Sequence, residues 1–168
     1  MNMDFKLEKW SLDHSNSIVK HANNKKIAEN LRNGFPNPYT ENDSLNYINT
    51  IIDDDTQIAR AIIVNNEAVG SITIIKQQDV YEKSAELGYW LSEDYWNKGI
   101  LSKLIPEIIK IAFNELDIVR IFAEPFSYNT ASIRVLEKSG FKLEGKKEKS
   151  IYKNGKYSDS YIYALLKD

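Results

Sequence analysis

Short segments rich in isoleucine and valine recur along this chain, and they constrain its fold more than any other feature. Residues 58–64, 69–75 and 118–123 are made largely of such apolar, β-branched side chains. Apolar runs of this length are typical of buried strands and are short for buried helices. Asn65 and Asn66 lie between the first two runs and favour a tight turn, so these two runs are predicted to form a hairpin.

The rest of the chain shows both helical and extended spacing. Strands are also predicted at 5–10, 85–91, 141–152 and 156–166, and helices at 11–22, 26–31, 40–52, 101–112 and 130–139. Pro106 should bend the fourth of these helices or delay its start. Helices alternate with strands only in the second half of the chain. The sequence therefore predicts an α/β (α+β) fold, with a mixed sheet that contains a parallel pair around the long helix.

The composition excludes several classes of function. Lys and Arg total 22 against 24 Asp and Glu, and this net charge of -2 argues against a protein that mainly binds nucleic acid. The absence of cysteine removes disulfides, thiolate metal sites and a cysteine nucleophile. The histidines, His14 and His21, are too few for a histidine-rich metal site, and both are predicted to lie at the surface.

Length and sequence pattern also bound the organisation of the chain. A chain of 168 residues fits one domain, and we expect residues 1–168 to form it. Asp4, Lys6 and Glu8 place charges where a signal peptide needs an apolar run. No stretch approaches the ~20 apolar residues of a membrane-spanning helix. We therefore expect a cytoplasmic monomer or homodimer, with neither a membrane nor a nucleic acid as partner.

The segment 96–102 joins a predicted strand to a predicted helix. Such a junction presents free backbone N–H groups and the positive end of the helix dipole, where a diphosphate can bind. Gly99 allows close approach of the backbone, Lys98 adds charge and Ser102 supplies a hydroxyl. An ordinary helix start with a flexible glycine would explain the same pattern. The candidate residues are Trp96, Asn97, Lys98, Gly99, Ile100, Leu101 and Ser102.

A second segment, 129–141, has the features of a short capped helix. Asn129 can cap its start, and Gly140 can close its end. Ala131 and Val135, four residues apart, are predicted to face the core. Ser132 lies about one turn after the cap, where its hydroxyl is a candidate functional group.

These two segments, together with the run 86–91, resemble the motifs of the GNAT family of N-acetyltransferases. They are most similar to the Rim-type branch, which acetylates ribosomal-protein N-termini, and the likeness extends to residues 36–40 and 159–161. The resemblance implies the GNAT fold, a mostly antiparallel sheet of about seven strands with a splayed parallel pair and about four helices. It also implies acetyl-CoA as co-substrate, an amine as acceptor and no metal.

The resemblance assigns a part of acetyl-CoA to each segment. The loop 96–102 is expected to bind the diphosphate, and the pantetheine arm to pair like an added strand with the backbone of Trp90 and Leu91. Asn129 is expected to face that arm. Leu101 departs from the family pattern, which usually has a small residue there. Leu136 stands where many relatives carry a tyrosine that protonates the leaving thiolate, so the resemblance leaves the acid open.

Acetyl transfer from a thioester requires a neutral amine as nucleophile. An N-terminal amine titrates near ~8 and a lysine near ~10.4, so a general base is useful. Glu86 is the candidate base, although a solvated carboxylate at a strand edge would look the same. Ser132 is the candidate acid or water anchor, unless its hydroxyl bonds its own helix backbone. A backbone N–H near Leu91 would polarise the carbonyl. Without a cysteine nucleophile, direct transfer in a ternary complex is the simplest scheme.

The acceptor is expected to bind between the loop 34–39 and the last hairpin. The candidate residues are Phe35, Tyr39, Glu41, Tyr128 and Tyr161, each of which also has an ordinary core or surface explanation. A protein N-terminus is the first expected acceptor, and it calls for an open groove. A small amine such as a polyamine or an antibiotic is the alternative, and it calls for a closed pocket rich in carboxylates. A non-catalytic acyl-CoA-binding sensor is a third interpretation.

Overall fold

The computed structural model describes residues 3–168, which contain a seven-stranded sheet in the order β1-β2-β3-β4-β5-β7-β6. The strands are β1 (Phe5–Lys9), β2 (Gln57–Val64), β3 (Glu67–Lys76), β4 (Ser84–Leu91), β5 (Arg120–Ala123), β6 (Lys142–Lys153) and β7 (Lys156–Leu166). The α-helices of this range are α1 (Ser15–Ala22), α2 (Lys25–Ala28), α3 (Glu41–Ile51), α4 (Ile100–Glu115) and α5 (Thr130–Lys138). The mixed sheet predicted from the sequence is confirmed.

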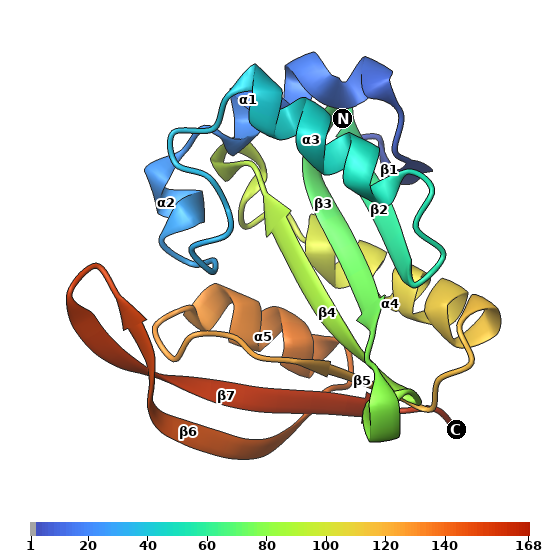
Figure 1. Ribbon diagram of the computed structural model, residues 1–168, viewed down its shortest axis with the longest axis vertical. Helices are drawn as coiled ribbons and strands as arrows, with labels where there is room; N and C mark the ends of the chain where they lie inside the picture. The colour runs from blue at the N-terminus through green and yellow to red at the C-terminus, as the bar shows by residue number, and fades with distance from the viewer. Residues whose placement is uncertain (1–2) are drawn as a thin grey trace.

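β4 and β5 form the parallel pair, and they are paired over a short stretch only. Their register runs from Ser84 opposite Arg120 to Glu86 opposite Phe122. β4 then continues to Leu91 alongside β3, whereas β5 ends soon after, and the two strands diverge from their shared end (Figure 1). This confirms the predicted splayed pair, and it leaves one edge of β4 without a strand beyond Glu86.

Helices cover the two faces of the sheet unequally. On one face α4 and α5 bury a large core of aliphatic side chains that includes Leu87 of β4 and Ile121 of β5. On the other face α1 and α3 pack over the part formed by β1, β2 and β3 (Figure 1). Glu86 and Phe122 are register partners that alternate with the buried positions of their strands, so they lie on this second face, beyond the helices.

Local signals in the sequence placed the turns and caps correctly. Thr40 and Asp43 form the capping box at the start of α3. Asn65 and Asn66 turn between β2 and β3 with φ of 50° and 66°, and Gly155 has a φ of 75° in the turn between β6 and β7. These left-handed conformations are the ones that two-residue hairpin turns require.

The bounds of two predicted helices need correction. The first α-helix begins only at Ser15, because residues Leu12–His14 form a separate 3₁₀ turn before it. The second helix covers only Lys25–Ala28 and does not reach residue 31. Pro106 lies inside α4, which begins at Ile100, so of its two predicted effects the delayed start is excluded and the bend stays a prediction. None of the helices within residues 3–168 is long and apolar enough to cross a bilayer. The same residues contain no cluster of three or more metal-ligating side chains.

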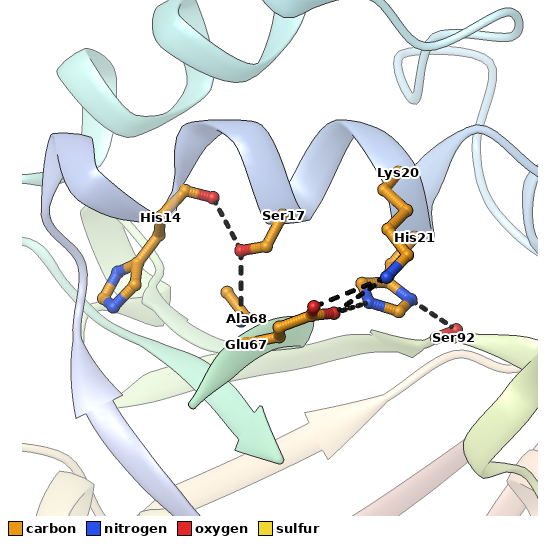
Figure 2. Close-up of polar contacts among 7 residues, drawn as sticks. All are labelled: His14, Ser17, Lys20, His21, Glu67, Ala68 and Ser92. Atoms are coloured by element: carbon orange, nitrogen blue, oxygen red, sulfur yellow. Dashed lines mark hydrogen bonds and ion pairs between the residues drawn. The ribbon is translucent and has the colours of Figure 1, made fainter. Parts of the chain in front are cut away.

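His21 is buried, which corrects the prediction that both histidines lie at the surface. Its Nδ1 lies 2.9 Å from Ser92 Oγ and its Nε2 lies 2.9 Å from a carboxylate oxygen of Glu67, which also pairs with Lys20 at 3.1 Å (Figure 2). The hydrogen bond from His21 is the main reason that the pKa of Glu67 is lowered. The imidazole thus joins α1 to β3 and to the residue that follows β4. Ser92 is only 3% exposed, so this Ser–His–Glu arrangement has no open face for a substrate.

We expect His21→Ala to lower the free energy of unfolding by about 2–4 kcal/mol, because it creates a cavity and leaves the buried Ser92 hydroxyl without its partner. Urea unfolding followed by circular dichroism measures this. His14→Ala is the matched control, since His14 is partly exposed and should cost less. A cost at His21 no larger than that at His14 would contradict the structural role of the network.

Candidate active site

The unpaired edge of β4 presents backbone groups in a fixed alternation. The Ser92 N–H donates to the Val69 carbonyl at 2.8 Å, and Trp90 stands opposite Ser71 in the β3–β4 register. In an antiparallel pair, alternate residues direct their N–H and C=O groups to the partner strand. The backbone N–H and C=O groups of Trp90 therefore form hydrogen bonds with β3. Those of Leu91 point the other way, toward the gap between β4 and β5. Of the two backbone positions predicted to pair with pantetheine, Leu91 is the one with a free N–H.

The loop that follows β4 is anchored to the same edge. Trp96 Nε1 donates to the Leu91 carbonyl at 2.8 Å. Asn97 and Gly99 both have left-handed φ values, 60° and 73°, and Gly99 is the N-cap residue of α4. Within residues 3–168 no side chain caps this helix start, which leaves the N–H groups of its first turn available to a ligand. A Cβ built on Gly99 would meet no atom within 4 Å, which means that the loop opens into space there.

A cavity of about 510 Å³ lies between this loop, the end of β4 and α5. The structure brings together on its wall every residue predicted to bind the co-substrate, and their role in binding stays a prediction. These residues are Trp90, Leu91, Trp96, Asn97, Lys98, Gly99, Ile100, Leu101, Ser102, Asn129 and Ser132. Lys98 Nζ donates to the Asp94 carbonyl at 2.7 Å and lies 5.2 Å from the centre of the Tyr95 ring, so its charge is held beside the loop.

α5 contributes more to this cavity than the sequence indicated. Ala131 is exposed and lines the cavity, which corrects the prediction that it faces the core, whereas Val135 packs against the core as predicted and also lines the cavity. Leu136 is the fully buried residue of the helix. Arg134 and Lys138 also line the cavity and add positive charge near a candidate phosphate site. Periodicity alone missed them because a ligand-facing surface of a helix looks like any polar surface.

Asn129 and Ser132 lie together at the start of α5. Asn129 Oδ1 accepts a hydrogen bond from the Ser132 N–H at 3.2 Å, so Asn129 is the helix cap. The Ser132 hydroxyl lies 2.5 Å from the Tyr89 hydroxyl, so its partner is a side chain of β4. Burial raises the pKa of Tyr89 to about 12. Tyr89 was not among the predicted site residues.

A second cavity, of about 660 Å³, lies on the far side of these residues. Its wall includes the aromatic rings of Phe35 and Trp90, whose centres are 5.7 Å apart, and the carboxylates of Glu86 and Glu124. The two cavities meet at residues that line both of them, namely Asn30, Leu31, Tyr89, Trp90, Asn129 and Ser132. The two cavities therefore share a stretch of wall formed by β4, the start of α5 and the segment after α2.

Comparison with known proteins identifies the family behind this geometry. The acetyltransferase (GNAT) domain family matches residues 4–142. The chain belongs to the GNAT acetyltransferase family. This confirms the resemblance inferred from the segments 86–91, 96–102 and 129–141.

Individual GNAT relatives agree with this placement. The chain is similar to the uncharacterized N-acetyltransferase YoaA of Bacillus subtilis, with 35% identity over 85 residues, and to the putative ribosomal N-acetyltransferase YdaF of the same organism, with 33% identity over 110 residues. These matches cover 51% and 66% of this chain and 48% and 60% of the two relatives. This chain thus matches between about half and three fifths of their length.

A solved GNAT structure supports the fold. RimL, a ribosomal L7/L12 alpha-N-protein acetyltransferase in complex with coenzyme A, superposes with a TM-score of 0.86. The superposition covers 96% of this chain and 93% of that chain at 22% identity. At this identity the likeness concerns the fold.

The structure places the residues predicted for the acceptor of this GNAT protein in two groups. Phe35 and Tyr39 line the second cavity, and burial raises the pKa of Tyr39. Glu41 is the exposed first residue of α3, and the Tyr128 hydroxyl donates to the Glu29 carbonyl. Tyr161 packs against the core under α4 and α5. The last three are not on the wall of the second cavity.

Two charged residues of the second cavity were missed by sequence reasoning. Arg32 forms an ion pair with Glu86. Glu124 accepts a hydrogen bond from the buried Ser160 hydroxyl at 2.7 Å and pairs with Lys147 at 3.2 Å. Neither pair has a signal in the sequence, because each joins segments more than 20 residues apart that meet only in the folded chain.

Proposed function

We propose that this protein transfers the acetyl group of acetyl-CoA to a primary amine, by direct attack within a ternary complex. The observation that carries the proposal is the meeting of two cavities at Tyr89, Asn129 and Ser132. One cavity has an uncapped helix start and a free strand edge, which suit a diphosphate and an amide-rich arm. The other has a carboxylate and aromatic rings, which suit an amine.

The acetyl-CoA side of the proposal rests on backbone groups. The diphosphate would accept hydrogen bonds from the N–H groups of the first turn of α4, where the helix dipole favours negative charge. The pantetheine arm would pair with the free edge of β4 at Leu91. The Leu91 N–H is also available to polarise the thioester carbonyl, and it would stabilise the oxyanion that forms on attack.

The chemical step joins the amine nitrogen to the acetyl carbon and breaks the bond between that carbon and sulfur. Glu86 is proposed to accept the proton that the amine loses. Its ion pair with Arg32 must open for this role. The Glu86 side chain is 22% exposed but the Arg32 side chain is 68% exposed, so Arg32 can turn into solvent when a cationic amine takes its place. The thiolate that leaves is proposed to be stabilised by Ser132.

The acceptor is proposed to be the N-terminal amine of a protein or peptide. The names of YdaF and RimL, given above, support this acceptor class. The carboxylates of Glu86 and Glu124 on the cavity wall suit a cationic amine, and they would equally suit a small amine. A small polyamine or aminoglycoside is therefore the alternative acceptor.

An acceptor panel tests the function. The purified protein is incubated with acetyl-CoA and with peptides of varied N-terminal residue, polyamines, aminoglycosides or free amino acids, and release of free thiol is measured. We expect the largest kcat/KM with a peptide N-terminus, and mass spectrometry should find the acetyl group on its α-amine. A preference for a polyamine or aminoglycoside would show that the proposed acceptor class is wrong, whereas the proposed acetyl transfer to an amine would stand. Tight binding of acetyl-CoA without transfer to any member would show a non-catalytic sensor and overturn the proposal.

A further inference from the structure

We propose that Tyr89 is a positioning residue for Ser132, whose proton it directs toward the sulfur atom of the leaving thiolate. The inference rests on the proposed function. It names the residues that stabilise the thiolate that leaves in that reaction. Tyr89 and Ser132 are 43 residues apart in the sequence and meet at the junction of the two cavities.

The contact between these two side chains is close and specific. The Tyr89 hydroxyl lies 2.5 Å from Ser132 Oγ and 3.4 Å from the Ser132 carbonyl oxygen. The shorter distance lies at the lower limit for a hydrogen bond between two hydroxyls, and the longer one is marginal. Both residues line the two cavities, so the contact lies at the junction where the reacting atoms would meet.

Both hydroxyls carry a proton at neutral pH, and the proposal assigns Tyr89 as the donor to Ser132 Oγ. With a pKa raised to about 12, the Tyr89 phenol keeps its proton at neutral pH and can donate it. Both oxygens in its reach belong to Ser132, and Oγ is the nearer. When Oγ accepts the phenol proton, the serine's own proton must point away from Tyr89. The nearby Asn129 Oδ1 already accepts the Ser132 backbone N–H. Ser132 lines both cavities, and the proposal places its proton there.

This orientation matters most when the bond between carbon and sulfur breaks. The sulfur then gains negative charge, and a hydroxyl that donates to an anion makes a stronger hydrogen bond than one that donates to a neutral group. Two hydroxyls in series strengthen each other's donation. Leu136 of the same helix is fully buried in the core and has no polar group to offer. Tyr89 and Ser132 together therefore stabilise the thiolate better than a serine alone.

The test is a double-mutant cycle of Tyr89→Phe and Ser132→Ala, measured by thiol release with the best acceptor of the panel. We expect Tyr89→Phe to lower kcat about tenfold, with the KM for acetyl-CoA within about twofold of the parent. Ser132→Ala should lower kcat at least as much. The double variant should match Ser132→Ala alone, because Tyr89 acts only through the serine.

Tyr163→Phe is the matched control for a merely structural role. The Tyr163 hydroxyl donates to Glu137 at 2.9 Å, so this variant also removes a tyrosine hydroxyl that holds α5, at a point away from Ser132. Its kcat should stay within twofold of the parent, and thermal unfolding of all variants checks that they are folded.

Three results would overturn the inference while the parent enzyme remains active. They are an unchanged kcat in Tyr89→Phe, a double variant whose loss equals the product of the two single losses, and an equal loss in Tyr163→Phe. A parent that transfers acetyl to no amine would overturn the proposed function and this inference with it.

Discussion

Glu86→Gln is expected to lower kcat by about 10²- to 10⁴-fold, the usual contribution of a general base. The amide keeps the shape of the carboxylate and a hydrogen-bonding oxygen, but it cannot take the proton of the attacking amine. Acetyl-CoA affinity should stay nearly unchanged, because Glu86 lines the second cavity and not the one between the loop and α5. Steady-state kinetics with the best acceptor, together with calorimetric titration of acetyl-CoA, measures both quantities.

A rise in pH should partly rescue this variant. An N-terminal amine titrates near ~8, so a larger share of it is already neutral as the pH rises through that value, and the need for a base falls. The rate of Glu86→Gln relative to the parent should therefore increase from mildly acidic to alkaline pH. A variant that matches the parent over the whole range would show that Glu86 is not the base.

Glu144→Gln is the matched control for this experiment. Glu144 also pairs with an arginine, Arg120, at 2.8 Å, but it lines neither cavity. Its replacement removes a carboxylate–guanidinium pair of the same kind from the same sheet. We expect kcat to stay within twofold of the parent. An equal loss in both variants would point to a general effect of broken ion pairs.

Gly99→Val is expected to weaken acetyl-CoA binding by about 10- to 100-fold while the fold is kept. Gly99 has a φ of 73°, which a β-branched residue adopts only at a cost of about 1–3 kcal/mol. The loop can relieve that strain only by turning its N–H groups away from the phosphates. The added side chain would also occupy open space where the diphosphate is proposed to bind. Calorimetric titration with acetyl-CoA checks this.

Gly155→Val separates the loss of binding from the cost of strain. Gly155 has a φ of 75° and open space around its Cβ position, as Gly99 does, but it lies in the hairpin between β6 and β7. Both variants should lose similar stability, and only Gly99→Val should lose affinity for acetyl-CoA. Unchanged affinity for acetyl-CoA in a folded Gly99→Val protein would show that the diphosphate does not bind at this loop.

Features decided within a few residues could be predicted from the sequence. The β-branched runs became β2 and β3, the Asn65 turn has the expected left-handed backbone, and Thr40 with Asp43 caps α3. The loop before α4 was recognisable for the same reason, because a glycine at a helix start permits the left-handed backbone conformation that Gly99 adopts. Such preferences arise from sterics and hydrogen bonds between near neighbours, and the rest of the chain need not be known.

The walls of the two cavities were decided only by the tertiary structure. Arg32 meets Glu86 across 54 positions and Tyr89 meets Ser132 across 43. These contacts exist because β4 and β5 part after three register pairs, while α4 and α5 pack against the same face of both strands. The sequence around a hydroxyl or a charged group does not indicate which distant group it will contact. That partner depends on how apolar residues pack elsewhere in the chain.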